Sequence, residues 1–391
     1  MTPDAEPPSV FPSAEGQCVV VRVDMNVPLE GGHITDPTRV LESLPTLQTL
    51  LNDEPRQLHI LTHIGRPKGR RVPELSTRVL LPLLEEHLGV KVAFREDLTA
   101  SDAPVQLHEN LRFFAGEESN DPAFRAQLRG LSPEKYVNDA FATSHRAHAS
   151  MVGFHGQVPC YAGLLVLKEV RALSPYVIPE KRIIPGLTVV LGGAKMETKI
   201  PVLRQFTGVA EQMLIGGAVA NTFLAAQGYD PGSSLYEAEM TDDAMEILLQ
   251  AEQSGTGVHL PVDVRCADGL ESPLVLDAPV EDVMGSMQML DIGPHTIASF
   301  REIIAHSSAI ICNGTMGVNT HPRFAAGTRE IFTAIAKNSG TTLIGGGDSL
   351  EALQREDIDP QQFSHVCTGG GAMLEYLSGK PMPGLQGLEN L

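Results

Sequence analysis

The sequence predicts an α/β protein made of two doubly wound domains, each built on a parallel sheet. Short apolar runs alternate with longer segments of helical periodicity along the chain, which is typical of strands joined by helical crossovers. Four of the six apolar runs in the second half end in glycine pairs or triplets, as strand-to-helix turns often do. With 391 residues, the chain is also longer than one typical core supports.

In the first half, three apolar runs predict buried strands and two amphipathic segments predict helices. The expected strands are 18–23, 57–63 and 135–141, and the expected helices are 39–51 and 77–89. In the second half, the expected strands are 187–193, 212–217, 258–263, 308–314, 341–347 and 365–371. A helix over 161–177, followed by the Pro-rich segment "IPEKRIIPG", predicts the domain boundary near 170–186.

Charge and cysteine usage exclude several classes of protein. The chain carries 48 acidic and 29 basic residues, and a formal net charge of −19 argues against non-specific binding to nucleic acid or anionic membranes. Its five cysteines are widely spaced without a CxxC pair, which favours neither a disulfide framework nor a zinc site and suits the reducing cytoplasm. No apolar run approaches the ~20 residues of a membrane helix. The Pro-rich first sixteen residues are expected to form a mobile lead-in, not a signal peptide.

A basic stretch, "HIGRPKGRR", follows the expected strand 57–63 and interrupts this acidic background. A single such run is usually solvated surface. However, candidate ligand-binding residues follow several strands of the same predicted sheet: Asp24, Asn26, Arg39, His63, Arg66, Arg112 and Arg146. Ligands bind at the carboxyl ends of parallel strands, and arginines clustered there are suited to phosphate or carboxylate groups. His145 and His148 have a spacing that metal ligands can have, but no third ligand is evident, so the anion site is favoured.

Three glycine-rich turns in the second half predict a site for a nucleotide polyphosphate. "LGGAKMETK" places Lys195 and Lys199 one helical turn apart after a glycine pair, "IGGGDS" carries Asp348, and "CTGGGAML" opens the last helix. Glycines let backbone N–H groups approach phosphate oxygens, and a neighbouring aspartate is a suitable Mg²⁺ ligand. The chain has neither a Walker loop nor a G-x-G-x-x-G after its first strand, so P-loop and NAD enzymes fit poorly.

Taken together, these segments closely resemble the phosphoglycerate kinase family, from about Val19 to Leu385. The matching motifs, in order, are "VRVDMNVPL", "ITDPTR", "HIGRPKG", "ENLRFFAGEE", "VNDAFATSHRAHAS", "LGGAKMETK", "LDIGP", "NGTMGV", "IGGGD" and "TGGGAMLEYLSGKPMPG". The resemblance implies two Rossmann-like domains joined by a hinge helix, and reversible phosphoryl transfer between ATP and the carboxylate of 3-phosphoglycerate in glycolysis. It also implies a cytoplasmic enzyme that uses Mg²⁺ and is monomeric, as most family members are.

The resemblance also assigns domains and residues. It implies a phosphoglycerate-binding domain of residues 1–173 with 378–391, a linker of 174–185, and a nucleotide-binding domain of 186–377. The seven residues named above would bind phosphoglycerate. The nucleotide and its Mg²⁺ would be bound by Gly193, Lys195, Lys199, Gly217, Asn313, Gly317, Thr320, Gly346, Asp348, Ser349 and Gly370, with Asp348 as the metal ligand. The groups acting directly in transfer would be Arg39, Lys199 and the helix N-terminus at Gly371.

The nucleotide half departs from the family pattern. The family has W-N-G-P-M-G-V-F-E where this chain has "CNGTMGVNT", so Thr320 replaces the glutamate that binds ribose and Thr315 replaces a proline near adenine. Thr198 replaces an aspartate before the second lysine, and "GGAV" replaces a Gly-Gly-Gly-Met turn. Two alternatives therefore stay open: a specialised paralog with another nucleotide or phosphorylated carboxylate as substrate, and a binding protein without catalysis.

Overall fold

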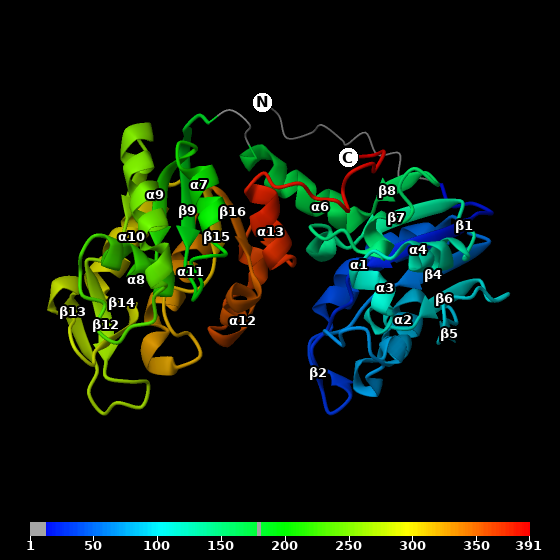
Figure 1. The fold of residues 1–391 in the computed structure, drawn as a ribbon, viewed down its shortest axis with the longest axis horizontal. Coiled ribbons are helices and arrows are strands. Elements are labelled where there is room, and N and C mark those ends of the chain that lie inside the picture. Colours follow the sequence, from blue (N-terminus) through cyan, green and yellow to red (C-terminus); the bar gives the residue numbers. More distant parts are fainter. Residues whose placement is uncertain (1–12, 178–180) are drawn as a thin grey trace. The chain divides into compact units, whose positions relative to one another are not determined.

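The computed structural model describes residues 13–177 and 181–391, so the predicted N-terminal lead-in lies largely outside the described residues. The chain divides into two compact units. Unit 1 runs to Arg171 and also contains Pro381–Leu391, and unit 2 runs from Ala172 to Lys380. Each unit interleaves strands and helices (Figure 1).

Unit 1 is built on a six-stranded parallel sheet with the strand order β5-β6-β4-β1-β7-β8. Its strands are β1 (Cys18–Val23), β4 (Gln57–Leu61), β5 (Ala93–Arg95), β6 (Val105–His108), β7 (Lys135–Asp139) and β8 (Cys160–Ala162), with a small hairpin of β2 (Leu29–Glu30) and β3 (His33–Ile34). Its helices are α1 (Thr38–Asn52), α2 (Leu81–Leu88), α3 (Ala115–Glu118), α4 (Pro122–Arg129) and α5 (Ala149–Val152), and α6 (Leu164–Leu173) leads into unit 2.

Unit 2 has a second six-stranded parallel sheet with the order β11-β10-β9-β15-β16-β17. These strands are β9 (Ile184–Leu191), β10 (Ala210–Ile215), β11 (Gly257–His259), β15 (Ala309–Asn313), β16 (Thr341–Gly345) and β17 (His365–Cys367). An antiparallel sheet adds β12 (Asp263–Ala267), β13 (Leu276–Pro279) and β14 (Gln288–Ile292). The helices are α7 (Ile200–Phe206), α8 (Gly217–Ala226), α9 (Thr241–Ser254), α10 (Pro294–His306), α11 (Ala326–Ala336), α12 (Gly347–Arg355) and α13 (Gly370–Leu377).

The prediction of parallel α/β sheets is confirmed, because both central sheets pair in parallel throughout. Every residue of β1 is buried, as a strand covered on both faces should be. The amphipathic helix α1 contributes Val40, Leu47 and Leu50 to the core of unit 1. A separate core in unit 2 joins the central sheet to α10, α11 and α12. The carboxyl ends of the strands are therefore held on rigid, close-packed layers.

Two expected elements differ in the structure. The predicted strand 258–263 splits into the short β11 and the start of β12, which belongs to the antiparallel sheet. The predicted helix 161–177 begins only at Leu164, because Cys160–Ala162 pairs with β7 as an edge strand. Asp139 Oδ1 caps the helix by accepting the backbone N–H of Leu165 at 2.8 Å. A Cβ at Gly163 would lie 2.2 Å from that same oxygen, so the turn needs glycine there.

The C-terminal segment returns to unit 1 (Figure 1, red) and forms hydrogen bonds with residues there. Asn138 Nδ2 donates to the carbonyl of Gly384 at 2.8 Å, and Asn390 Oδ1 accepts the N–H of Ala162 at 2.7 Å. The predicted linker 174–185 includes residues 178–180, which are outside the described part of the chain. Within the described part, no helix has the length and apolar content needed to cross a membrane.

A buried pair of histidines predicts that unit 1 loses stability in acid. The rings of His59 and His108 are fully buried with nitrogens 2.9 Å apart, and burial lowers the pKa of each to about 4. Unfolding restores a pKa near 6.5, so the unfolded chain binds more protons between these values. The unfolding free energy should therefore fall as the pH drops from about 6.5 towards 4, by up to about 1.4 kcal/mol per pKa unit for each ring.

Urea midpoints of unfolding between pH 7.5 and 4.5 measure this effect. The double substitution His59→Gln, His108→Gln should reduce the acid loss by the contribution of this pair, since amides do not titrate, while the other buried histidines keep their contributions. The exposed His87 of α2 supplies the control His87→Gln, which should leave the dependence unchanged. An equally steep acid loss in the double variant would contradict the assignment to this pair.

Candidate active site

The predicted anion-binding residues of unit 1 follow the carboxyl ends of β1, β4, β6 and β7. Asp24 lies directly after β1, and its carboxylate forms an ion pair with Arg39 from α1. Asn26, two residues on, accepts the backbone N–H of Gly65 through Oδ1 at 2.7 Å. These contacts tie the loop after β4, and with it the exposed Arg66, to the end of β1. The structure thus places on an anchored loop a guanidinium that has no ion pair among the described residues.

His63 follows β4 and is buried against a second arginine that the sequence analysis did not single out. Nη2 of Arg22 lies 2.9 Å from His63 Nδ1, and the Arg22 side chain is only 1% exposed. Burial, followed by the charges of neighbouring arginines, holds the pKa of His63 well below its usual range. His63 is therefore a neutral group surrounded by cations.

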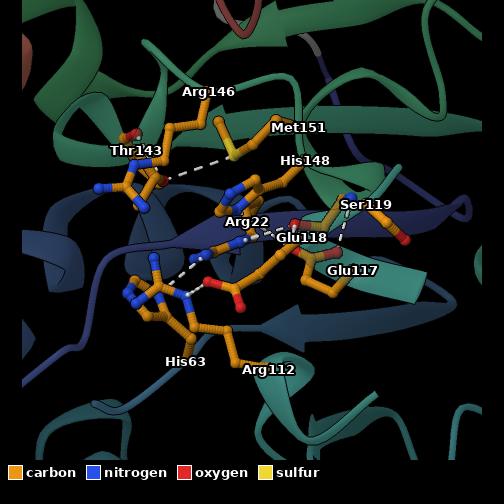
Figure 2. Close-up of polar contacts among 12 residues, drawn as sticks. Arg22, His63, Arg112, Glu117, Glu118, Ser119, Thr143, Arg146, His148 and Met151 are labelled. Atoms are coloured by element: carbon orange, nitrogen blue, oxygen red, sulfur yellow. Dashed lines mark hydrogen bonds and ion pairs between the residues drawn. The ribbon is translucent and has the colours of Figure 1, made fainter. Parts of the chain in front are cut away.

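Arg112 lies in the same cluster, with Arg146 close enough to affect its ionisation (Figure 2). Its Nη1 donates to the carbonyl of Gly65 at 2.8 Å, and Glu118 lies 3.5 Å from its Nε. Burial lowers the pKa of Arg112 to about 10, and Arg146 adds to this effect. Arg146 Nε donates to Nε2 of His145 at 3.0 Å. Like charges held this close together are stabilised by an anionic ligand.

A buried acid supports the cluster from behind. Glu117 is fully buried, and both its oxygens accept from Ser150, from the hydroxyl at 2.6 Å and from the backbone N–H at 2.9 Å. The Ser150 hydroxyl oxygen in turn accepts from Nε of Arg22 at 3.1 Å. An arginine inside the otherwise apolar run "CVVVRV" is the sequence signal that marks this network. Among the described residues, neither His145 nor His148 belongs to a group of three potential metal ligands.

In unit 2, a cavity of about 320 Å³ gathers the predicted phosphate-binding residues. It is lined by residues that include Gly193, Lys195, Lys199, Asn313, Gly346, Asp348, Ser349, Gly370 and Gly371. The Lys199 side chain is almost fully buried, and its Nζ donates to Oδ1 of Asn313. Burial lowers the pKa of Lys199 to about 8, while nearby Asp348 acts in the opposite direction. The lysine is thus a positive charge with little hydration at the floor of the cavity.

The glycine-rich turns around Lys199 are shaped by close backbone packing. Gly346 has φ +109°, and a Cβ there would lie 2.8 Å from Nδ2 of Asn313. The Ser349 hydroxyl accepts the N–H of Gly314 at 2.8 Å, which joins the turn after β16 to the turn after β15. Helix α13 begins at Gly370, so its first backbone N–H groups face the same cavity.

A second cavity of about 440 Å³ adjoins the first, since Gly193, Ala194 and Asp348 line both. The predicted Gly217, Gly317 and Thr320 line this larger cavity, as does Thr315. Its apolar walls include Leu235, Pro261 and Leu290. A polar cavity rich in backbone N–H groups beside a larger apolar one suits a nucleoside polyphosphate.

Glu351, which the sequence analysis missed, also lines the larger cavity. It lies on α12, three residues after Asp348, so both carboxylates project from one face of the helix. That i, i+3 spacing was the signal in the sequence.

Comparisons with known proteins agree along nearly the whole chain. The model of the family "Phosphoglycerate kinase" matches residues 12–380. Proteins named phosphoglycerate kinase from Thermosipho africanus and Dinoroseobacter shibae are 42% and 40% identical to the chain, and each alignment covers at least 96% of both proteins. The solved structure of phosphoglycerate kinase from Coxiella burnetii superimposes with a TM-score of 0.85 at 36% identity, covering 96% of this chain and 97% of that one. The structure from Pyrococcus horikoshii gives a TM-score of 0.78 at 30% identity, covering 97% of each chain.

Proposed function

The chain belongs to the phosphoglycerate kinase family, and on this basis we propose that unit 1 binds 3-phosphoglycerate while unit 2 binds MgATP or MgADP. The family's reaction moves the γ-phosphoryl group of ATP to the carboxylate of 3-phosphoglycerate, which leaves ADP and 1,3-bisphosphoglycerate in glycolysis. One observation carries the assignment of ligands to units: unit 1 contains a cluster of arginines, whereas unit 2 contains the buried Lys199.

On the acceptor side, the residues of unit 1 bind and orient an anion and need not remove a proton. The attacking group is a carboxylate, which is already ionised at neutral pH. Arg66, Arg112 and Arg146 supply the positive charge for the substrate phosphate, and Arg39 holds the carboxylate for attack in line with the transferred group. Asp24 and Asn26 bind the substrate and, through Arg39 and the loop at Gly65, hold the site's geometry.

On the donor side, unit 2 stabilises the charge of the moving phosphoryl group. Lys199 does so from the cavity floor, where limited hydration strengthens its electrostatic effect. The N–H groups that open α13 at Gly370 and Gly371 face the same charge, and Lys195 binds the phosphates from the exposed side of the cavity. The nucleotide site is completed by residues that line the two cavities: Gly193, Gly217, Gly317, Gly346, Ser349 and Asn313.

The residues around Asp348 fit a Mg²⁺ ion. Its carboxylate is exposed at the junction of both cavities and takes part in no hydrogen bond or ion pair among the described residues. Magnesium is bound in such sites through one or two carboxylates together with substrate phosphates. When bound, Mg²⁺ would neutralise phosphate charge, while Asp348 fixes the position of that charge beside Lys199.

The decisive assay is phosphoryl transfer from MgATP to 3-phosphoglycerate, coupled to NADH oxidation through glyceraldehyde-phosphate dehydrogenase. Robust turnover supports the proposal and excludes the binding protein without catalysis. No turnover by folded protein that still binds 3-phosphoglycerate would overturn it in favour of another donor or acceptor. We further propose that the protein is a monomer and lies in the cytoplasm. Its five free, buried cysteines are suited to that reducing compartment.

Glu351 is proposed to bind the ribose hydroxyls, in place of the family glutamate that is Thr320 here. Its carboxylate has no hydrogen-bond or ion-pair partner among the described residues and lines the same cavity as Thr320. Replacing Glu351 with glutamine should raise KM for MgATP about 3- to 10-fold, which corresponds to one hydrogen bond. KM for Mg-2′,3′-dideoxy-ATP should change little, because that nucleotide lacks both hydroxyls.

Steady-state kinetics with the two nucleotides check this prediction. The exposed Glu302 of α10 offers the matched control Glu302→Gln, for which no change is expected. In the opposite direction, Thr320→Glu should restore affinity in the Glu351→Gln background. If Glu351→Gln impaired both nucleotides equally, the carboxylate would not be reading the ribose.

A further inference from the structure

We propose that Arg22 is a positioning residue that fixes the tautomer of His63, so that His63 presents a neutral Nε2–H donor to the phosphoglycerate. The proposal rests on the assignment of 3-phosphoglycerate to unit 1. It gives a task to an arginine that lies inside the protein and was not among the predicted ligand-binding residues.

The hydrogen bond between the two side chains has only one possible direction. A guanidinium is a donor at every nitrogen and cannot accept, and Arg22 Nη2 lies 2.9 Å from His63 Nδ1 (Figure 2). Nδ1 must therefore offer its lone pair, and the single ring proton of a neutral imidazole must be on Nε2. No described residue forms a hydrogen bond with Nε2, so this donor is available to a ligand.

Arg22 can impose this choice because its guanidinium is fixed on every side. Its Nε donates to the Ser150 hydroxyl at 3.1 Å, and Nη1 donates to the carbonyl of Val23. Ser150 is held in turn by Glu117, whose buried carboxylate provides the opposite charge. With the Arg22 side chain only 1% exposed, water offers no alternative partner for these N–H groups.

The charges that face His63 oppose a second proton on the ring. Burial disfavours the imidazolium most strongly. Four neighbouring groups disfavour it further: Arg22 from β1, Arg112 after β6, Arg39 from α1 and His148 before α5. Since an imidazole is neutral above its pKa, His63 stays a neutral donor throughout the range in which a free histidine would titrate.

The tautomer matters because the expected ligand is an anion rich in hydrogen-bond acceptors. With the proton on Nε2, His63 donates to a substrate oxygen. With the proton on Nδ1, the ring would direct a lone pair at that oxygen and two N–H donors, from Arg22 and His63, would face each other. One tautomer thus makes a charge-assisted hydrogen bond to the substrate, and the other makes a repulsive contact. Binding sites use such differences to select ligands.

Nuclear magnetic resonance of the ¹⁵N-labelled histidine rings in the full-length protein tests the proposal directly. Long-range ¹H–¹⁵N correlation distinguishes Nε2–H, Nδ1–H and doubly protonated rings. The wild-type protein should show His63 as Nε2–H, unchanged between pH 5.5 and 8.5, and its ring signals should shift when 3-phosphoglycerate is added. An Nδ1–H ring, or a titration near pH 6.5, would overturn the proposal without any variant.

Variants then test the part played by Arg22. Arg22→Met should convert His63 to a mixture of the two neutral tautomers, because burial and the remaining arginines still disfavour the imidazolium. KM for 3-phosphoglycerate should rise about 10- to 100-fold, the equivalent of one hydrogen bond to a charged group. KM for MgATP should stay unchanged. Arg22→Lys should recover much of the Nε2–H signal, since an ammonium also only donates.

The exposed Arg70 provides the matched control Arg70→Met, which removes the same charge without moving the ring signals. If Arg22→Met does not fold, Ser150→Ala offers a milder change that frees Nε of Arg22 and should shift His63 in the same direction. A wild-type ring that is Nε2–H but unaffected by 3-phosphoglycerate would overturn the positioning role, even in an enzyme whose turnover supports the proposed function. Loss of turnover with an unchanged Nε2–H ring in Arg22→Met would overturn it as well.

Discussion

Replacing Lys199 with alanine is expected to lower kcat for phosphoryl transfer by about 10²- to 10³-fold, the usual cost of removing one group that stabilises transition-state charge. Lys199 is only 7% exposed and contacts Asn313. Water entering the space left by the side chain would not supply the positive charge that is lost. KM for 3-phosphoglycerate should remain within about twofold, because that substrate is assigned to unit 1. The coupled assay, with MgATP varied, measures both constants.

The exposed Lys337 after α11 supplies the control Lys337→Ala, which should retain full activity. Circular dichroism and urea unfolding of both variants separate a loss of catalysis from a loss of structure. Full kcat in Lys199→Ala would contradict the assigned role, and equal loss in both variants would point to a damaged unit 2.

Replacing Arg39 with alanine is expected to have the second largest effect, by raising KM for 3-phosphoglycerate about 10- to 100-fold and lowering kcat. Two causes act together. The substrate carboxylate loses a charge-assisted hydrogen bond, and the nearly buried Asp24 is left as an unpaired negative charge facing an anionic substrate. Steady-state kinetics with 3-phosphoglycerate varied, at saturating MgATP, measure the change.

The double variant Arg39→Ala, Asp24→Asn separates the two causes, since it removes the unpaired charge as well. Partial recovery of KM without recovery of kcat is expected. Arg56, which pairs with Glu134 on the surface of unit 1, gives the control Arg56→Ala and should be neutral. An Arg39→Ala enzyme with wild-type kinetics would show that the substrate carboxylate is oriented by another group.

The sequence predicted the main strands because burial on both faces leaves a continuous apolar run, as in β1 and β15. It could not predict β6, in which Gln106 and His108 are buried through specific hydrogen bonds that leave no periodic pattern. The antiparallel β12–β14 sheet was missed for another reason. One of its two outer strands, β13, is mostly exposed, so it lacks the apolar signal of the central strands.

The candidate site was more predictable than the edges of the fold, because its side chains follow strand ends whose positions the apolar runs already mark. The structure brings all the predicted nucleotide-site residues to two adjoining cavities. Arg22 was missed because no role can be assigned to an arginine inside a buried strand until its partner is known. That partner, His63, is 41 residues away in the chain, and only the pairing of β1 with β4 brings the two together.

The return of residues 381–391 to unit 1 has a consequence for synthesis on the ribosome. Asn138 receives its backbone partner from Gly384, 246 residues later, so β7 and β8 stay incompletely bonded until all of unit 2 has been made. Unit 2 is continuous in sequence and contains all its own strands, so it can fold as a unit without a segment from elsewhere in the chain. The first unit to emerge is therefore the last to be completed, and a nascent chain halted before Gly384 would hold an open edge at β8 that chaperones and proteases can recognise.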